Sequence, residues 1–143
     1  EHHYSDNGII RLIHQSVEIE GLKIFGSPYT PTFGIDWVYN INRSKIYEYW
    51  QEIPEDTDVV VTHGPPLGIG DLTGGEKLEQ VGDRSLLKRM MVVKPKLHVF
   101  GHLHDEPDII NHGLRRVKDI DFVNASVVDL YHKPINKPVR WTV

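Results

Sequence analysis

The chain has 143 residues, of which 39% are hydrophobic and 25% are charged, the composition of a single ordinary globular domain. Its formal net charge of −4 argues against a general surface for polyanions such as nucleic acids, and no apolar run approaches the roughly 18 residues of a membrane span. The absence of cysteine excludes disulfides, thiolate zinc sites and cysteine nucleophiles, so any bound metal must use histidine, carboxylate, amide or water ligands.

The N-terminal half predicts strands, a long loop and one helix. Near-alternation of apolar and polar residues predicts one or two strands over residues 9–19, and a further strand over residues 22–26. Residues 27–42 form a loop that is rich in aromatic residues and interrupted by prolines. A helix follows, in which apolar residues recur at helical spacing, Ser44 can cap the first turn and Pro54 ends the last.

The C-terminal half alternates buried strands with a second helix. The valine run at 58–62 lacks alternation, which is typical of a strand buried on both faces. A loop over 63–75, a helix over 83–93 and a strand over 97–101 follow. Later strands are predicted at 113–117, 121–127 and 139–143. Strands and helices that alternate and then give way to strands alone predict an α/β domain whose sheet becomes antiparallel at its end.

Two histidine motifs follow the predicted buried strands. His63 precedes Gly64 at the end of the first, and Gly101 precedes His102 and His104 at the end of the second. Neutral imidazoles are good ligands for zinc-, iron- and manganese-class ions, and glycine allows a close approach of the backbone. If the second motif stays extended, its two histidines can share one ion; if it turns after the glycine, they can reach two adjacent ions. The alternative is a set of polar loop residues at the surface.

These motifs resemble those of a known family. Residues 62–66 and 101–104 resemble two signature motifs of the calcineurin-like metallophosphoesterases. Further stretches resemble the metallophosphoesterase domain-containing (MPPED) branch of that superfamily, and together the resemblance covers about residues 14–130 in the expected order. These stretches are 22–31, 62–68, 94–102 and 124–126.

The resemblance implies a fold, a reaction and a set of ligands. The fold would be the C-terminal part of the family's αββα sandwich, an α/β arrangement with mixed sheets. His63 and His102 would bind one divalent ion and His104 a second, with Mn, Fe, Zn and Mg as the candidate metals. Two such ions about 3.5–4 Å apart activate a metal-bound hydroxide for in-line attack on a phosphoester. The implied substrates are nucleotide or small aryl phosphodiesters.

The family's remaining ligands come from Asp-x-His, Gly-Asp and Gly-Asn-His motifs that precede these histidines. The first and last of these do not occur in this chain, and the Gly-Asp pairs at 70–71 and 82–83 come after His63, in the wrong order. We therefore expect residues 1–143 to be a single, incomplete domain with half of a dinuclear site. The catalytic groups would lie upstream of Glu1, which would itself be the last residue of a truncated Gly-Asn-His-Glu motif.

Candidate substrate-binding residues are Gly64, Tyr29, Trp37 and Asn124, chosen for their places beside the motifs and in the aromatic loop. For the aromatic residues of that loop, Phe33 and Tyr39 included, loop packing is the favoured alternative to a cleft wall. Other polar residues receive structural expectations: His98 as a buried structural or supporting residue, His14, His112 and His132 at the surface or in loops, and Lys88 and Arg89 on the outer face of the second helix.

Three functional hypotheses follow. The first is an enzyme acting on a small phosphoester, located in the cytoplasm, without general nucleic-acid or membrane binding. The second is a non-catalytic module for interaction or regulation that binds at most one metal ion. The third is a split arrangement, in which a homodimer partner or the N-terminal half of a longer protein completes the sheet.

Overall fold

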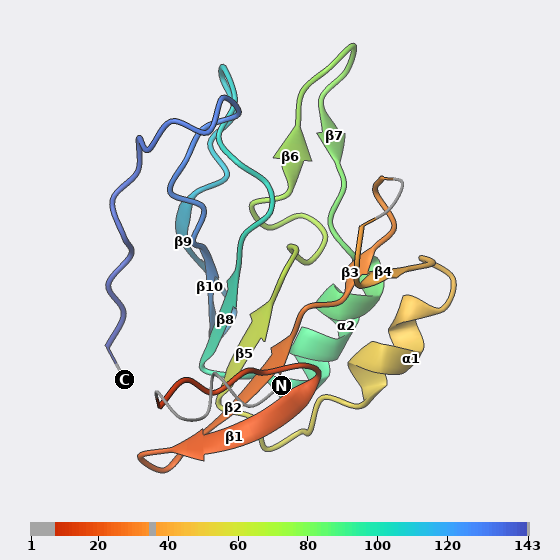
Figure 1. Cartoon of the computed structure of the whole chain (residues 1–143), viewed down its shortest axis with the longest axis vertical. Coiled ribbons are helices and arrows are strands. Elements are labelled where there is room, and N and C mark those ends of the chain that lie inside the picture. Colours follow the sequence, from red (N-terminus) through yellow and green to blue (C-terminus); the bar gives the residue numbers. More distant parts are fainter. Residues whose placement is uncertain (1–7, 35–36, 143) are drawn as a thin grey trace.

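The computed structural model describes residues 8–34 and 37–142, which are built around a six-stranded mixed sheet (Figure 1). In spatial order the sheet comprises β1 (Gln15–Ile19), β2 (Leu22–Ser27), β5 (Val59–Thr62), β8 (Leu97–Phe100), β10 (Ile120–Asn124) and β9 (Gly113–Val117). The four central strands are parallel, whereas β1 and β9 run antiparallel to their neighbours at the two edges. The predicted α/β class and the antiparallel end of the sheet are therefore confirmed.

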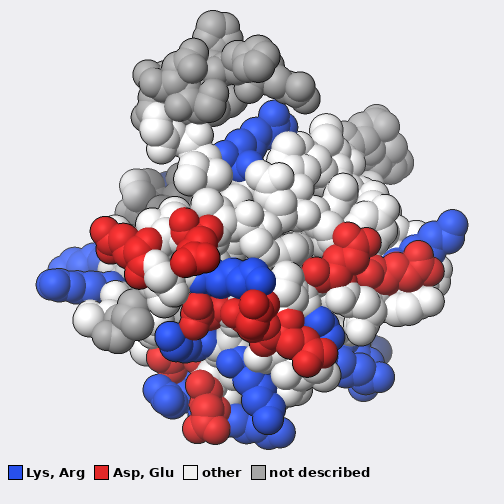
Figure 2. Space-filling model, turned by 90° about the horizontal axis from the view of Figure 1, so that it is seen from below, with Lys and Arg blue, Asp and Glu red and all other residues white. Residues whose placement is uncertain are grey.

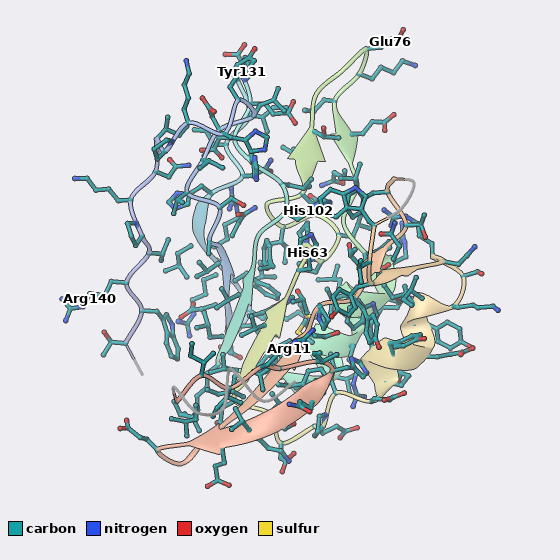
Figure 3. The ribbon with its side chains drawn as sticks, viewed as in Figure 1. Arg11, His63, Glu76, His102, Tyr131 and Arg140 are labelled. Carbon is teal, nitrogen blue, oxygen red and sulfur yellow. The ribbon has the colours of Figure 1, made fainter. Side chains whose placement is uncertain are left out.

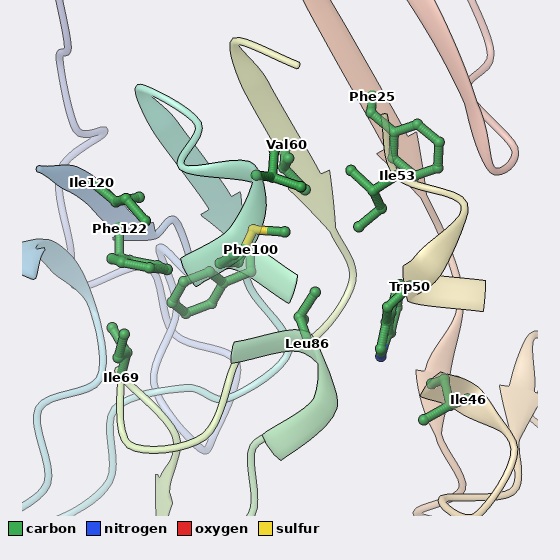
Figure 4. Close-up of a cluster of buried hydrophobic side chains, with 12 residues drawn as sticks. Phe25, Ile46, Trp50, Ile53, Val60, Ile69, Leu86, Phe100, Ile120 and Phe122 are labelled. Atoms are coloured by element: carbon green, nitrogen blue, oxygen red, sulfur yellow. The ribbon is translucent and has the colours of Figure 1, made fainter. Parts of the chain in front are cut away.

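Two helices, α1 (Ile46–Gln51) and α2 (Arg84–Val93), lie against one face of this sheet (Figures 1 and 4). They connect β2 to β5 and β5 to β8, as expected for parallel neighbours. The main hydrophobic core fills the space between helices and sheet, and its buried members are Phe25, Ile46, Trp50, Ile53, Val60, Ile69, Leu86, Met90, Val93, Phe100, Ile120 and Phe122.

The opposite face of the sheet is only partly covered. Val59, Leu97 and Val123 form a smaller cluster there, against which Val139 and Trp141 of the C-terminal segment pack. Farther along β5, Val61 on this face is 38% exposed. The expectation of a strand buried on both faces is thus wrong at Val61, because the C-terminal segment covers only one end of this face.

The helix termini agree with the sequence prediction at α2 and differ at α1. Asp83 caps α2, since its carboxylate accepts the backbone N–H of Leu86 at 2.7 Å. At α1 the predicted Ser44 cap is wrong: the helix begins one residue after Lys45, whose side chain makes no capping bond. The Ser44 hydroxyl instead donates to Asn42 Oδ1, because a preceding Asx turn holds it there.

Several other sequence expectations are corrected by the structure. The strand predicted over 9–19 covers only its last five residues, and the strand predicted over 121–127 ends at Asn124. Residues 139–142 form no strand, because they cross the sheet face instead of pairing at its edge. Arg89 is buried rather than outward, since its guanidinium donates to the carbonyl of Ile53 under the end of α1.

Two short ribbons extend from the carboxyl end of the sheet. β3 (Thr30–Pro31) pairs with β4 (Asn40–Ile41) inside the aromatic loop, and β6 (Leu72–Thr73) pairs with β7 (Glu79–Gln80) after the first histidine motif. Both project beyond the central strands in Figure 1. They therefore surround the edge at which the histidine motifs lie.

The surface shown in Figure 2 carries acidic and basic side chains interspersed, with no extended area of one sign on that face. Exposed ion pairs such as Lys23–Asp56 at 2.7 Å and Lys96–Asp58 at 3.0 Å join the two signs locally. In the part of the chain that the structure describes, no helix has the length and apolar character that crossing a membrane requires.

Candidate metal centre

The candidate centre lies where the parallel strands end. His63 directly follows β5, and His102 follows β8 by two residues. Because β5 and β8 are parallel neighbours, their carboxyl ends meet at the same edge of the sheet. Figure 3 shows the two labelled histidines close together at this edge.

The two imidazoles face each other through ring nitrogens. His63 Nε2 and His102 Nδ1 are 3.2 Å apart, and the ring centroids are 4.7 Å apart. Two nitrogens that each lie about 2.0–2.1 Å from one tetrahedral zinc ion are separated by about 3.3 Å. One nitrogen of this pair can donate a proton to the other, or both can present lone pairs to a shared cation. The spacing therefore fits a pair of ligands to one divalent ion.

Burial keeps both rings in the form that binds metal. The protein environment lowers the pKa of His63 by desolvation. Desolvation, together with repulsion from His63 and His104, lowers the pKa of His102 to about 4. Both imidazoles are therefore neutral near pH 7 and retain the lone pairs that a metal requires.

The second motif turns sharply instead of continuing the strand. His102 has a φ of 72°, in the left-handed region that non-glycine residues rarely adopt. The turn is held by the N–H of Leu103, which donates to the carbonyl of Gly101 at 2.9 Å. Of the two conformations considered for this motif, the structure has the turned one. Within residues 8–34 and 37–142, no three histidine, aspartate or glutamate side chains converge on a point that could hold an ion.

His104 has its tautomer set by the backbone. Its Nδ1 lies 3.1 Å from the carbonyl oxygen of Asp129 and must donate to it, which leaves Nε2 as the acceptor nitrogen. Metal-binding histidines commonly donate their other ring N–H to a carbonyl in this way. The ring of His132 lies edge-on to His104, with centroids 5.4 Å apart. Among the described residues, His104 Nε2 has no hydrogen-bond partner, and the ring is oriented by a contact separate from the His63–His102 pair.

A groove opens beside His63. Its volume is about 470 Å³, and it is lined by Pro28, Thr30, Trp37, Val38, Tyr39 and His63. Trp37 is 55% exposed and so is accessible to a bound molecule. Phe33, from the same loop, contacts His102 with a centroid distance of 4.2 Å. The aromatic loop thus supplies one wall of the groove and also packs on the histidine pair.

The remaining substrate-binding candidates have other places. Tyr29 packs against Tyr49 and Tyr39, with ring centroids 4.6 and 5.9 Å away, so it serves loop packing and does not line the groove. Gly64 is buried and borders a narrow space together with His102. The expectation that Asn124 lines the cleft is wrong: the residue is fully buried, and its amide donates to the carbonyls of two loops.

Buried carboxylates near the centre organise loops. Asp71 accepts the N–H groups of Gly68 and Gly82, and Asp105 accepts those of Asn111 and His112. Both follow the histidine motifs in sequence, but within the described residues neither makes a hydrogen bond to a histidine ring. The two carboxylates therefore hold loops. Glu1, the expected remnant of an upstream motif, lies outside the described residues.

Two further histidines, His14 and His98, lie in the interior. His14, expected at the surface, has only 9% of its side chain exposed and lies among the rings of Phe25, Tyr29 and Tyr49. His98 is fully buried, as expected, and its bond to Thr62 was not anticipated. A histidine in the middle of an apolar strand was the available signal for such a bond.

Comparisons with known proteins identify the family and the relatives of this chain. The family model of the calcineurin-like phosphoesterases matches residues 4–106. Human metallophosphoesterase domain-containing protein 1 is 38% identical over 132 residues, covering 91% of this chain and 38% of that protein. A UPF0046 protein of Caenorhabditis elegans is 33% identical over 125 residues, covering 87% of this chain and 40% of that protein. The chain thus spans less than half the length of these relatives.

A solved crystal structure superimposes with a TM-score of 0.59 at 19% identity, over 85% of this chain and 48% of the other, which shows a common fold. One mixed sheet with helices on one face is the C-terminal part of the family's sandwich, as the resemblance implied. Since the family model matches well over half of the residues, the chain belongs to the calcineurin-like phosphoesterase family, in its MPPED branch.

Proposed function

We propose that this chain is part of a metal-dependent phosphodiesterase acting on nucleotide or small aryl diesters, and that it supplies one half of a dinuclear site. The observation that carries the proposal is the 3.2 Å separation of His63 Nε2 and His102 Nδ1, two neutral nitrogens facing each other at the end of the sheet. Membership of a phosphoesterase family that uses divalent metals supports the general reaction.

The histidines of this chain would supply some of the ligands of the two ions. His63 and His102 would share one ion, and the free Nε2 of His104 would bind the other, with Mn, Fe, Zn and Mg as candidates. Bound divalent ions supply Lewis acidity and lower the pKa of a coordinated water. His104 Nδ1 would keep its proton and donate it to the Asp129 carbonyl in a hydrogen bond, which leaves Nε2 available. The missing carboxylate and amide ligands would come from the remainder of a longer protein or from a partner chain.

The groove beside His63 supports an aromatic substituent on the substrate. Its volume of about 470 Å³ is within the range of small-molecule sites, and Trp37, which is 55% exposed, lines it. Stacking of a nucleobase or aryl ring on such a face contributes about 1–3 kcal/mol. This geometry favours a small phosphoester over a nucleic-acid duplex as the partner.

The proposal is tested by Mn²⁺-dependent hydrolysis of bis(4-nitrophenyl) phosphate, with metal content measured on the same samples. The substrate should be turned over by a protein in which the upstream region is restored and much more slowly by residues 1–143. In the longer protein His63→Ala and His104→Ala should abolish turnover, while Lys88→Ala on the exposed face of α2 should not change it. Equal rates for the short and long chains would refute the half-site, and unchanged rates in the histidine variants would refute the ligands.

A second candidate function is a non-catalytic module that binds at most one ion. The observation in its favour is that no three candidate ligands converge in the described part of the chain. This function would be favoured over hydrolysis by two results together. The longer protein would hydrolyse neither phosphodiesters nor phosphomonoesters with any of the four metals, and each chain would bind one ion.

A further inference from the structure

His98 is a polar side chain in a mostly apolar setting. It lies in the middle of β8 with no exposed surface, between the rings of Phe100 and Phe122 at centroid distances of 5.2 and 5.6 Å. Burial of an imidazole among apolar groups is costly unless its nitrogens find partners. An apolar side chain of similar volume would serve the core without that cost. The contacts of the ring therefore indicate what it contributes.

A directed chain of hydrogen bonds runs from His98 to the first histidine motif. The hydroxyl of Thr62 donates its only proton to the carbonyl of Gly64 at 2.8 Å. The same hydroxyl lies 2.9 Å from His98 Nε2 and must accept there, so His98 carries its proton on Nε2. The opposite nitrogen, Nδ1, is buried and makes no hydrogen bond to the described residues. The ring is thus committed to holding Thr62.

The same segment is held from its other side. The N–H of Gly101 donates to the carbonyl of His63 at 3.0 Å, which joins the two histidine motifs directly. The carbonyls of His63 and Gly64 are therefore fixed by consecutive bonds, one from the β8 loop and one from the Thr62 hydroxyl. The first of these peptide groups is attached to the Cα of His63 and the second follows the Cα of Gly64, so the two bonds fix the backbone turn from which the His63 ring leaves.

We propose that Thr62 and His98 are positioning residues that hold His63 opposite His102, a role that rests on the proposed function insofar as the pair binds an ion. Thr62 acts on the backbone of the motif, and His98 acts through Thr62. Neither touches the ion or the substrate. Removal of either hydrogen-bonding group should therefore make the position of the His63 ring relative to His102, now 3.2 Å between the facing nitrogens, less well defined. Both metal-binding side chains would still be present.

Affinity for Co²⁺ alone, measured by calorimetry and by its visible absorption, tests this role. Thr62→Val keeps the volume and removes the hydroxyl, and it should weaken Co²⁺ binding about 10-fold, the low end of the effect of outer-shell partners. Thr62→Ser should restore binding to within about twofold of the wild type, because it keeps the hydroxyl. His98→Leu should weaken binding, whereas His98→Gln, whose amide can donate from near the Nε2 position, should recover most of it.

Two further variants separate positioning from loss of stability. Ile120→Val removes a methylene from the same buried layer and should leave Co²⁺ affinity unchanged. The double variant Thr62→Val/His98→Leu should bind about as weakly as Thr62→Val alone, because the two residues act in series. Additive losses would show that His98 does not act through Thr62 and would overturn its assigned role.

Nuclear magnetic resonance without metal gives an independent readout. The His98 Nε2 proton should exchange slowly in the wild type and rapidly in Thr62→Val, with loss of the cross-peaks between the His63 and His102 rings. If the wild type does not bind Co²⁺ and His63→Ala behaves identically, the proposed metal pair is refuted, and the ring cross-peaks still decide the positioning role. Unchanged cross-peaks and affinity in Thr62→Val would overturn the inference.

Discussion

The buried His98 should make the stability of this protein steeply dependent on pH. Complete desolvation lowers the pKa of His98 from 6.5 to about 3 in the folded state. In the unfolded chain the ring returns to its ordinary pKa and takes up a proton below pH 6.5, which the folded chain resists until about pH 3. Stability from this residue is therefore fully present above pH 6.5 and is lost as the pH falls toward 3.

The magnitude follows from the two pKa values. Between pH 7 and pH 5, linkage lowers the free energy of unfolding by about 2 kcal/mol through this residue, with a slope near pH 5 of about 1 kcal/mol per pH unit. The assay is urea unfolding at half-unit steps from pH 7 to pH 4.5 for the wild type and His98→Gln. Other titrating groups are common to both proteins, so the difference between their slopes isolates His98. Parallel slopes would refute the argument that the ring is neutral and desolvated.

Three further stability predictions follow from individual contacts, each checked by chemical denaturation. Asp83→Ala should lower the free energy of unfolding by about 2–3 kcal/mol, because it removes the cap of α2 and leaves the buried indole N–H of Trp50 unpaired. Asp83→Asn should lower it by less. Gly82→Ala should lower the free energy of unfolding by about 2–3 kcal/mol, since an added Cβ would lie 2.5 Å from the backbone carbonyl oxygen of Pro66. Gly101→Ala meets only the Ser126 hydroxyl, 3.4 Å away, and should cost less; equal costs would contradict this. Phe122→Ala in the buried core should lower the free energy of unfolding by about 3–5 kcal/mol. Val61→Thr on the open face of the sheet should change it by no more than about 0.5 kcal/mol, and a large loss would show that this face is covered.

Local sequence patterns were sufficient for the elements that carry the site. The valine run of β5 and the apolar run of β8 were recognisable without tertiary information, and so were the bounds of α2 to within one residue. The proximity of His63 and His102 follows because the carboxyl ends of neighbouring parallel strands share an edge. That part of the candidate centre could be anticipated from the order of elements alone.

Other features depend on contacts between distant segments. The exposure of Val61 reflects how far the C-terminal segment extends across the sheet, which no local pattern encodes. Arg89 is drawn inward by a carbonyl at the end of α1, and Asn124 by carbonyls of two loops. The place of Trp37 beside His63 depends on the course of a loop with few periodic residues. In each case the deciding partner lies more than twenty residues away in the chain.

The central claim is that His63 and His102 bind one divalent ion through Nε2 and Nδ1. The most direct test is titration of Zn²⁺ into the chain with ¹⁵N-labelled histidine, following the ring nitrogens. The account predicts that His63 Nε2 and His102 Nδ1 shift together and saturate at the same equivalent of zinc, while the His98 nitrogens do not move. Zinc binding that leaves both of these nitrogens unshifted, or that shifts only one of them, would contradict it.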